Sequence, residues 1–67
     1  MTSRKQEALA AVVAATEGAV ALDEFYPGSQ AHRAVGRGDV GTAVAAARAA
    51  GATDDEIRRA VKDRAFM

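Results

Sequence analysis

Residues able to do acid–base or metal chemistry are sparse in this 67-residue chain. It contains one histidine, His32, and no cysteine, which excludes a thiol nucleophile, a disulfide framework and a cysteine-based zinc site. A zinc ion needs three or four converging ligands, and His32 has no His or Cys partner. The carboxylates of Asp23-Glu24 and of Asp54-Asp55 are adjacent in sequence, so their side chains diverge. The sequence predicts no enzyme, no metal and no cofactor, with His32 partly exposed on a short helix.

One glycine pattern resembles a phosphate-binding loop. The segment Gly36-Arg37-Gly38-Asp39-Val40-Gly41 matches G-x-G-x-x-G, the fingerprint of dinucleotide-binding folds. That fingerprint works only after a buried strand of a parallel sheet. Residues 32–35 do not have the composition of such a strand, and the chain is too short for that fold. We therefore expect no dinucleotide site.

The composition predicts one small all-α domain with few large apolar residues to form a hydrophobic core. The chain has 18 alanines against seven valines, two leucines, one isoleucine and two phenylalanines. A domain of this size buries only about 60% of the surface that its unfolded chain exposes, and alanine adds little to that area. Dimerisation is a common remedy in small scaffolds, so we expect a homodimer or another protein partner.

Charge and hydropathy restrict the location and the partners. The formal net charge is zero, which argues against a strong sequence-independent affinity for nucleic acid or for an anionic membrane. The longest uncharged run, residues 8–16, is far below the roughly 20 apolar residues that span a bilayer. The N-terminus has no secretory pattern. We expect a cytoplasmic protein that does not enter the membrane.

Caps and apolar periodicity predict three or four helices. Ser3 with Gln6 three residues later forms a capping box, so the first helix is expected at about residues 4–22. Within it, Gly18 is expected to mark a close crossing or a slight bend. A turn at 23–28 follows from Pro27-Gly28. Ser29 then caps a short helix at about 30–36, which Gly36 and Gly38 are expected to end. The apolar residues expected to face inward from this short helix are Ala31, Ala34 and Val35.

The C-terminal part, at about residues 40–65, is expected to form a pair of helices. Asp39 is a good N-cap for the first of them, and its apolar face is formed by Val40, Ala43, Val44, Ala47 and Ala50. Gly51 closes this helix. Thr53 and Glu56 then form a capping box for the second helix, whose buried positions include Ile57 and Val61.

Residues 46–61, Ala-Ala-Arg-Ala-Ala-Gly-Ala-Thr-Asp-Asp-Glu-Ile-Arg-Arg-Ala-Val, resemble the helix-turn-helix of small bacterial, phage and plasmid DNA-binding regulators. A small residue in the first helix, Gly51 in the turn, Thr53 as the cap and Ile57 four residues later match that motif. The resemblance implies that the second helix enters the major groove of DNA. The DNA-contacting residues that it implies are Arg48, Thr53, Arg58, Arg59 and Lys62, with Asp54 and Asp55 also facing the groove.

Two features leave other interpretations open. Any tight hairpin of two alanine-rich helices needs the same glycine, cap and apolar positions, so the motif also fits plain architecture. Asp54, Asp55 and Glu56 open the second helix, where the helix dipole favours acids but DNA phosphates would repel them. The alternative function is a protein-interaction or structural module that binds through the alanine-rich first helix.

The first helix supplies the residues for that alternative. It is apolar on more than one side, which is typical of a helix buried on more than one side. The expected partner or dimer interface comprises Leu9, Val12, Val13, Val20, Phe25 and Tyr26. One of the two adjacent aromatic residues, Phe25 or Tyr26, is expected to fill the core at the corner between helices. The alternative is that they form an exposed patch for a partner.

Overall fold

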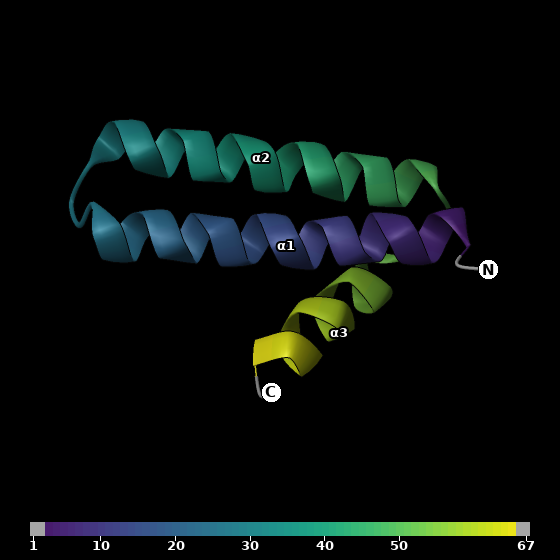
Figure 1. Cartoon of the computed structure of the whole chain (residues 1–67). Coiled ribbons are helices and arrows are strands. Elements are labelled where there is room, and N and C mark those ends of the chain that lie inside the picture. Colours follow the sequence, from purple (N-terminus) through teal and green to yellow (C-terminus); the bar gives the residue numbers. More distant parts are fainter. Residues whose placement is uncertain (1–2, 66–67) are drawn as a thin grey trace.

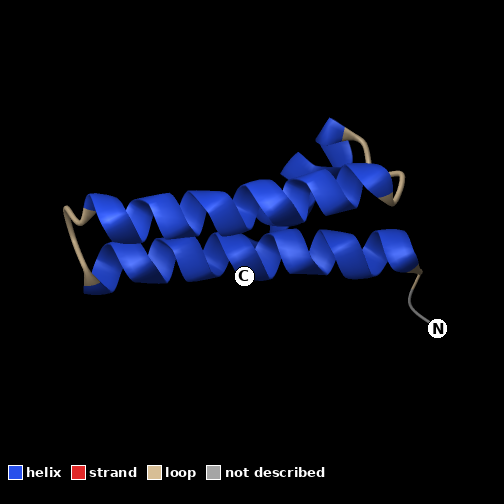
Figure 2. Cartoon of the chain, turned by 90° about the horizontal axis from the view of Figure 1, so that it is seen from above, coloured by secondary structure: helices blue, strands red, loops and turns tan. Residues whose placement is uncertain are grey.

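The computed structural model describes residues 3–65, and over this range the protein is an all-α, three-helix domain. Helix α1 spans Arg4–Phe25, α2 spans Gln30–Ala49 and α3 spans Asp54–Ala65. The helices α1 and α2 run antiparallel, side by side, as a long hairpin (Figures 1 and 2). The short α3 crosses one face of this hairpin and packs more extensively on α1 than on α2.

Helix α1 begins where the sequence predicts but ends later. The Ser3 side chain accepts a hydrogen bond from the Gln6 backbone N–H at 3.1 Å. The helix then continues three residues beyond the predicted end and stops at Phe25, one residue before Tyr26. Tyr26 precedes Pro27, and a residue before proline is disfavoured in the helical conformation. Gly28 takes a positive φ of 79° in the turn that follows.

The predicted break between a short second helix and a third helix is wrong. Gly36 and Gly38 both lie inside one continuous α2, and Asp39 is an exposed residue within this helix rather than its N-cap. Each glycine disfavours a helix by about 1 kcal/mol relative to alanine. Packing along α1 outweighs that cost, because tertiary contacts supply most of the stability of helices in proteins.

The close crossing of α1 and α2 lies at Ala19 and Gly36. A Cβ placed on Gly36 would be 2.9 Å from the Ala19 Cβ, so only glycine fits there without a shift. Gly18, which was expected to mark a close crossing or a slight bend, has nothing within 4 Å of an added Cβ and is not the crossing point.

The register of α2 also corrects the predicted buried residues. Gly36 and Ala47 are buried, and Val40, Ala43 and Val44 are half-buried between them. In this register the three positions predicted to face inward are all exposed: Ala31, Ala34 and Val35. The prediction was wrong because it treated this segment as a separate short helix with its own buried side.

The turn between α2 and α3 is a Schellman motif, as the glycine signal indicated. Gly51 has a φ of +99°, and its N–H donates to the Arg48 carbonyl at 3.0 Å. The Ala52 N–H donates to the Ala47 carbonyl at 3.0 Å. These two bonds satisfy carbonyls at the end of the helix. Both alanines are buried, so the motif anchors α3 to the hairpin as well as ending α2.

The core is small and lies at one end of the hairpin. Among the described residues the buried hydrophobic side chains are Val12, Ala47, Ala52 and Ile57. Leu9, Val44 and Val61 are among the half-buried residues packed around them. This core is where α1, α2 and α3 meet, near the Gly51 turn. The other end, at Pro27, has no third helix over it (Figure 1).

Candidate functional site

The predicted DNA-contacting cations of α3 face solvent. Arg58, Arg59 and Lys62 are all exposed, and none of them forms an ion pair with another described residue. Asp54, Asp55 and Asp63 are exposed on the same helix. Among the described residues, the solvent-facing side of α3 therefore carries both signs, with three basic side chains and three acidic ones.

The other two predicted DNA contacts are engaged within the protein. Arg48 forms an ion pair with Asp54 at 3.0 Å between Nε and Oδ1. The Thr53 hydroxyl accepts a hydrogen bond from the Glu56 backbone N–H at 3.2 Å, and the Glu56 carboxylate accepts one from the Thr53 N–H at 3.1 Å. The capping box predicted from the sequence is confirmed. It holds the Thr53 side chain in the cap instead of presenting it to a ligand.

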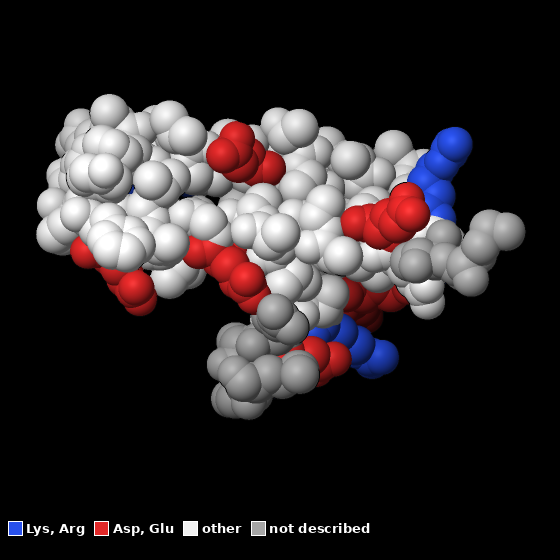
Figure 3. All heavy atoms as spheres, in the orientation of Figure 1, with Lys and Arg blue, Asp and Glu red and all other residues white. Residues whose placement is uncertain are grey.

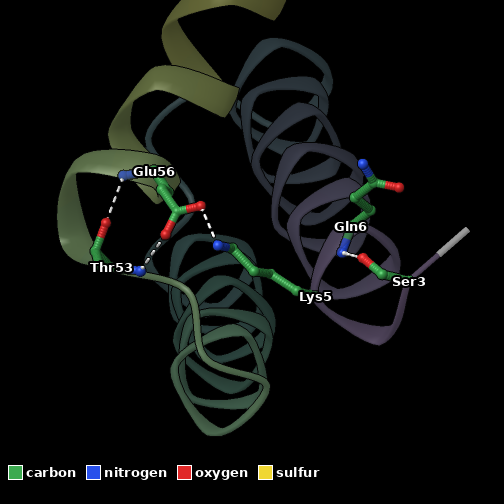
Figure 4. Close-up of polar contacts among 5 residues, drawn as sticks. All are labelled: Ser3, Lys5, Gln6, Thr53 and Glu56. Atoms are coloured by element: carbon green, nitrogen blue, oxygen red, sulfur yellow. Dashed lines mark hydrogen bonds and ion pairs between the residues drawn. The ribbon is translucent and has the colours of Figure 1, made fainter.

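The acids at the start of α3 are largely neutralised by the hairpin. Glu56 pairs with Lys5 of α1 at 2.5 Å, and Figure 4 shows the Lys5 side chain reaching from α1 to the Glu56 carboxylate. The hydrogen bond from Lys5, followed by the backbone bond from Thr53, lowers the pKa of Glu56 below 4.5. With Asp54 paired to Arg48, Asp55 is the acid of this turn without an ion pair among the described residues.

The six residues predicted for a partner interface lie in three environments: the core, the groove beside α3 and the exposed surface. Val12 is 1% exposed and belongs to the chain's own core, and Leu9 packs against that core. Val13 is half-buried and lines an open groove between α1 and α3 together with Val20 and Val61. The remaining members of the predicted set are exposed: Val20, Phe25 and Tyr26.

Neither aromatic residue fills the core, so that prediction is wrong. Phe25 is 77% exposed and Tyr26 is 50% exposed. The Tyr26 ring stacks on the His32 ring with centroids 3.9 Å apart. The core lies at the opposite end of the hairpin, and the close approach of Ala19 to Gly36 leaves no room for a ring between α1 and α2. Both aromatics are therefore left at the surface of the Pro27 end.

One side of the hairpin carries mostly small uncharged residues, with Arg4 and Glu7 near its N-terminal end and the exposed Asp39 beside Gly38. In α1, five uncharged residues recur at alternating spacings of four and three, so they share one side of the helix: Ala11, Ala15, Gly18, Leu22 and Phe25. In α2, six recur in the same way: Ala31, Val35, Gly38, Thr42, Ala45 and Ala49. We call these eleven residues the outer hairpin face.

The outer hairpin face lies away from α3. Figure 3 looks onto α1 and α2 with α3 below them, and uncharged atoms cover much of both helices, interrupted by several Asp and Glu side chains. The grooves on the α3 side are lined by other residues, including Val20, Arg33 and Arg37. All six members in α2 are exposed, and those in α1 are exposed or half-buried. This face cannot be recognised in the sequence when a helix is expected to end at Gly36.

The residues considered for chemistry do not assemble into a site. His32 is half-buried, and its Nδ1 lies 2.7 Å from the Ser29 hydroxyl, which also caps α2. Residues 36–41 lie within α2 and form no phosphate-binding loop. Among the described residues no group of three or more His, Asp or Glu side chains could hold a metal ion.

No helix within the described part of the chain has the length and hydropathy needed to cross a membrane. No protein family, curated protein or solved structure matches the chain significantly.

Proposed function

We propose that this protein is a helical interaction module that binds another protein through the outer hairpin face. The observation that carries the proposal is the exposure of two large apolar side chains on that face. Phe25 is 77% exposed and Val35 is 58% exposed, on a side of the hairpin where uncharged residues outnumber the charged ones (Figure 3). Contiguous apolar surface of this kind marks sites of protein association in soluble domains.

The composition of the face fits a protein partner. Exposed aromatic side chains are enriched among the residues that dominate binding energy at interfaces, and charged residues are depleted at interface centres. Phe25 supplies such an aromatic anchor near one end of the face. The alanines and glycines around it let a partner backbone approach closely, and they lose little side-chain entropy when they become buried.

A matched pair of variants tests the proposal. Val35 and Val20 are both valines of similar exposure, 58% and 54%, but Val35 belongs to the outer hairpin face and Val20 lines the groove beside α3. Tagged wild-type protein, Val35→Arg and Val20→Arg would be used to capture proteins from cells of the source organism. We expect a partner that wild type and Val20→Arg retain and Val35→Arg loses. Identical capture by all three proteins would contradict the proposal.

A second candidate function is DNA binding through α3. It is favoured by the three exposed cations Arg58, Arg59 and Lys62, which form no ion pair with other described residues. The internal pairing of Asp54 with Arg48 and of Glu56 with Lys5 also reduces the repulsion that these acids would exert on phosphates. The mixed charge of α3 predicts modest, salt-sensitive affinity.

Fluorescence anisotropy with labelled random and genomic duplexes at about 50 and 200 mM salt tests DNA binding. The variant Arg58→Ala/Arg59→Ala/Lys62→Ala is the comparison, with Val35→Arg as the control on the other surface. Binding that weakens with salt and is lost only in the triple variant would support this function. Absence of binding at micromolar wild-type protein in low salt would rule it out as an activity of the isolated chain.

A further inference from the structure

A second open surface lies in the angle between α1 and α3. Figure 1 shows α3 running obliquely away from α1, and the groove between them has a volume of about 320 Å³. Its apolar lining includes Val13, Val20 and Ala21 of α1, with Val61 of α3 on the other wall. Val20 is 54% exposed, and Val13 and Val61 are half-buried. None of the described lining residues belongs to the outer hairpin face, so this groove is a separate apolar surface.

The α1 wall of this groove is acidic. Glu17 and Glu24 both line it, and both are exposed. They lie seven residues apart in one helix, so they share a side of α1 and stand about 10.5 Å apart along its axis. The basic residues of α1 are Arg4 and Lys5, in the first turn at the far end of the helix. Figure 3 shows Asp and Glu side chains projecting from the edge of the hairpin on the α3 side.

Basic residues nearby belong to other surfaces. Arg33 and Arg37 of α2 line the adjoining groove between α1 and α2, and Arg33 is paired with Asp23 at 2.9 Å between Nε and Oδ1. Neither they nor the exposed cations of α3 are among the described residues that line the groove between α1 and α3. The described lining of this groove therefore combines apolar side chains with charge of one sign, which is negative.

We propose that the groove between α1 and α3 binds a basic amphipathic helix of another protein. This site lies on a different surface from the outer hairpin face and does not depend on the function proposed for that face. The described fold has no strand whose edge an extended peptide would join, whereas an apolar groove between helices accepts an amphipathic helix. Apolar residues at spacings of three and four would pack on Val13, Val20 and Val61, and Lys or Arg side chains seven residues apart would face Glu17 and Glu24.

A pair of model peptides tests this complementarity. The probe is a fluorescein-labelled peptide of about 14 residues, roughly 21 Å long as a helix, with leucine at positions i, i+3, i+4 and i+7 and lysine on both flanks. The control peptide keeps every leucine and has glutamate in place of each lysine. In fluorescence anisotropy at about 50 mM salt we expect the lysine peptide to bind at least about 10-fold more tightly than the control. Its affinity should fall at about 200 mM salt, because salt screens exposed charges.

Three protein variants assign the binding to this groove. Val20→Arg places a cation among the apolar lining residues and should weaken the lysine peptide by about 10-fold or more. Val35→Arg makes the same change at a similar exposure on the outer hairpin face and should leave the affinity within about 2-fold. Glu24→Gln keeps the shape of the side chain but removes its charge, so it should weaken binding by about 2–5-fold and reduce the salt dependence. Circular dichroism would establish that each variant keeps its helix content.

Four results would overturn the proposal. They are no binding of the lysine peptide at micromolar protein in low salt, equal binding of the two peptides, binding that Val20→Arg leaves intact, and binding that Val35→Arg weakens equally. Sedimentation velocity on the protein alone gives a fifth: a dimer that Val20→Arg dissociates would mean that a second copy occupies the groove. The function proposed for the outer hairpin face fails separately, since it depends on Val35 and this site depends on Val20.

Discussion

The two faces of the α1–α2 hairpin carry similar small apolar residues but have different neighbours. On the inner face, Val12 and Ala47 are covered by Ile57 of α3 and are almost inaccessible to solvent. On the outer face, Val35 and Phe25 remain more than half exposed. The hairpin thus has apolar residues on both of its faces. Helix α3 covers one face, over about half of the length of the hairpin, and leaves the other face exposed.

This difference follows from the lengths of the helices. The helix α1 has 22 residues and α2 has 20, but α3 has 12. At 1.5 Å per residue, α3 is about half as long as the hairpin that it crosses. Its position is fixed at the Gly51 turn by the Schellman motif and the Thr53 capping box. A helix of this length starting at that turn cannot cover the Pro27 end or the outer face.

The largest predicted change in the free energy of unfolding comes from truncating a buried aliphatic side chain, in contrast to an exposed one. Ile57→Ala removes the aliphatic side chain of α3 that is 8% exposed in the core and should lower the free energy of unfolding by about 2–4 kcal/mol. Val35→Ala removes methyl groups at a 58% exposed site and should change it by less than about 0.5 kcal/mol in the monomer. Urea denaturation at micromolar protein measures both. Equal losses would mean that the outer face is already covered.

Local signals in the sequence correctly predicted the start of α1, the end of α2 and the start of α3. Ser3, Gly51 and the Thr53–Glu56 pair all act within three or four residues of themselves, so a single sequence contains everything that their hydrogen bonds require. The all-α class and the Pro27 turn are predictable for the same reason. The apolar spacing around Ile57 also predicted which residues of α3 face solvent, including Arg58 and Arg59.

The failures concern contacts between distant segments. Local propensity predicts that a helix ends at Gly36. In the structure Gly36 lies inside α2 and packs closely against Ala19 of α1. The pairing of Arg48 with Asp54 and of Lys5 with Glu56 depends on where α3 lies relative to α1 and α2. The outer hairpin face is visible in the sequence only once α2 is known to be continuous. As long as residues 31–49 are assigned to two separate helices, their uncharged positions are not expected to share one face.

A change in stability of intermediate size is predicted for alanine substitutions at two glycines of α2, with opposite signs at the two positions. Gly36→Ala places a Cβ 2.9 Å from the Ala19 Cβ and 3.1 Å from its Cα, so the helices must separate, and we expect a loss of about 1–3 kcal/mol. Gly41→Ala meets nothing within 4 Å and should stabilise the protein by up to about 1 kcal/mol through helix propensity. Thermal and urea unfolding would measure the predicted loss of stability in Gly36→Ala and the predicted gain in Gly41→Ala. Stabilisation by Gly36→Ala would show that the two helices do not approach closely at Ala19.

The smallest effect should come from the ion pair that joins α1 to α3. The pKa of Glu56 is lowered in the folded state, first by Lys5 and then by the Thr53 backbone. A lowered pKa stabilises the fold at pH values above the ordinary carboxyl value of 4.5, and this stabilisation is lost as pH falls through the folded-state pKa, because the unfolded chain binds the proton more readily. The unfolding free energy contributed by Glu56 should therefore decline below about pH 4.5.

Glu56→Gln isolates this contribution from the other carboxylates. Glutamine can still complete a capping box with Thr53, but it carries no charge for Lys5. The difference in unfolding free energy between wild type and Glu56→Gln should be present at neutral pH and should shrink as pH falls below 4.5. In a Lys5→Met background the pH dependence of that difference should be weaker, since the largest cause of the lowered pKa is gone. A difference that stays constant from neutral to acidic pH would mean that Lys5 does not hold α3 against α1 in solution. The cover over the inner face would then depend on Ile57 and the Gly51 turn alone.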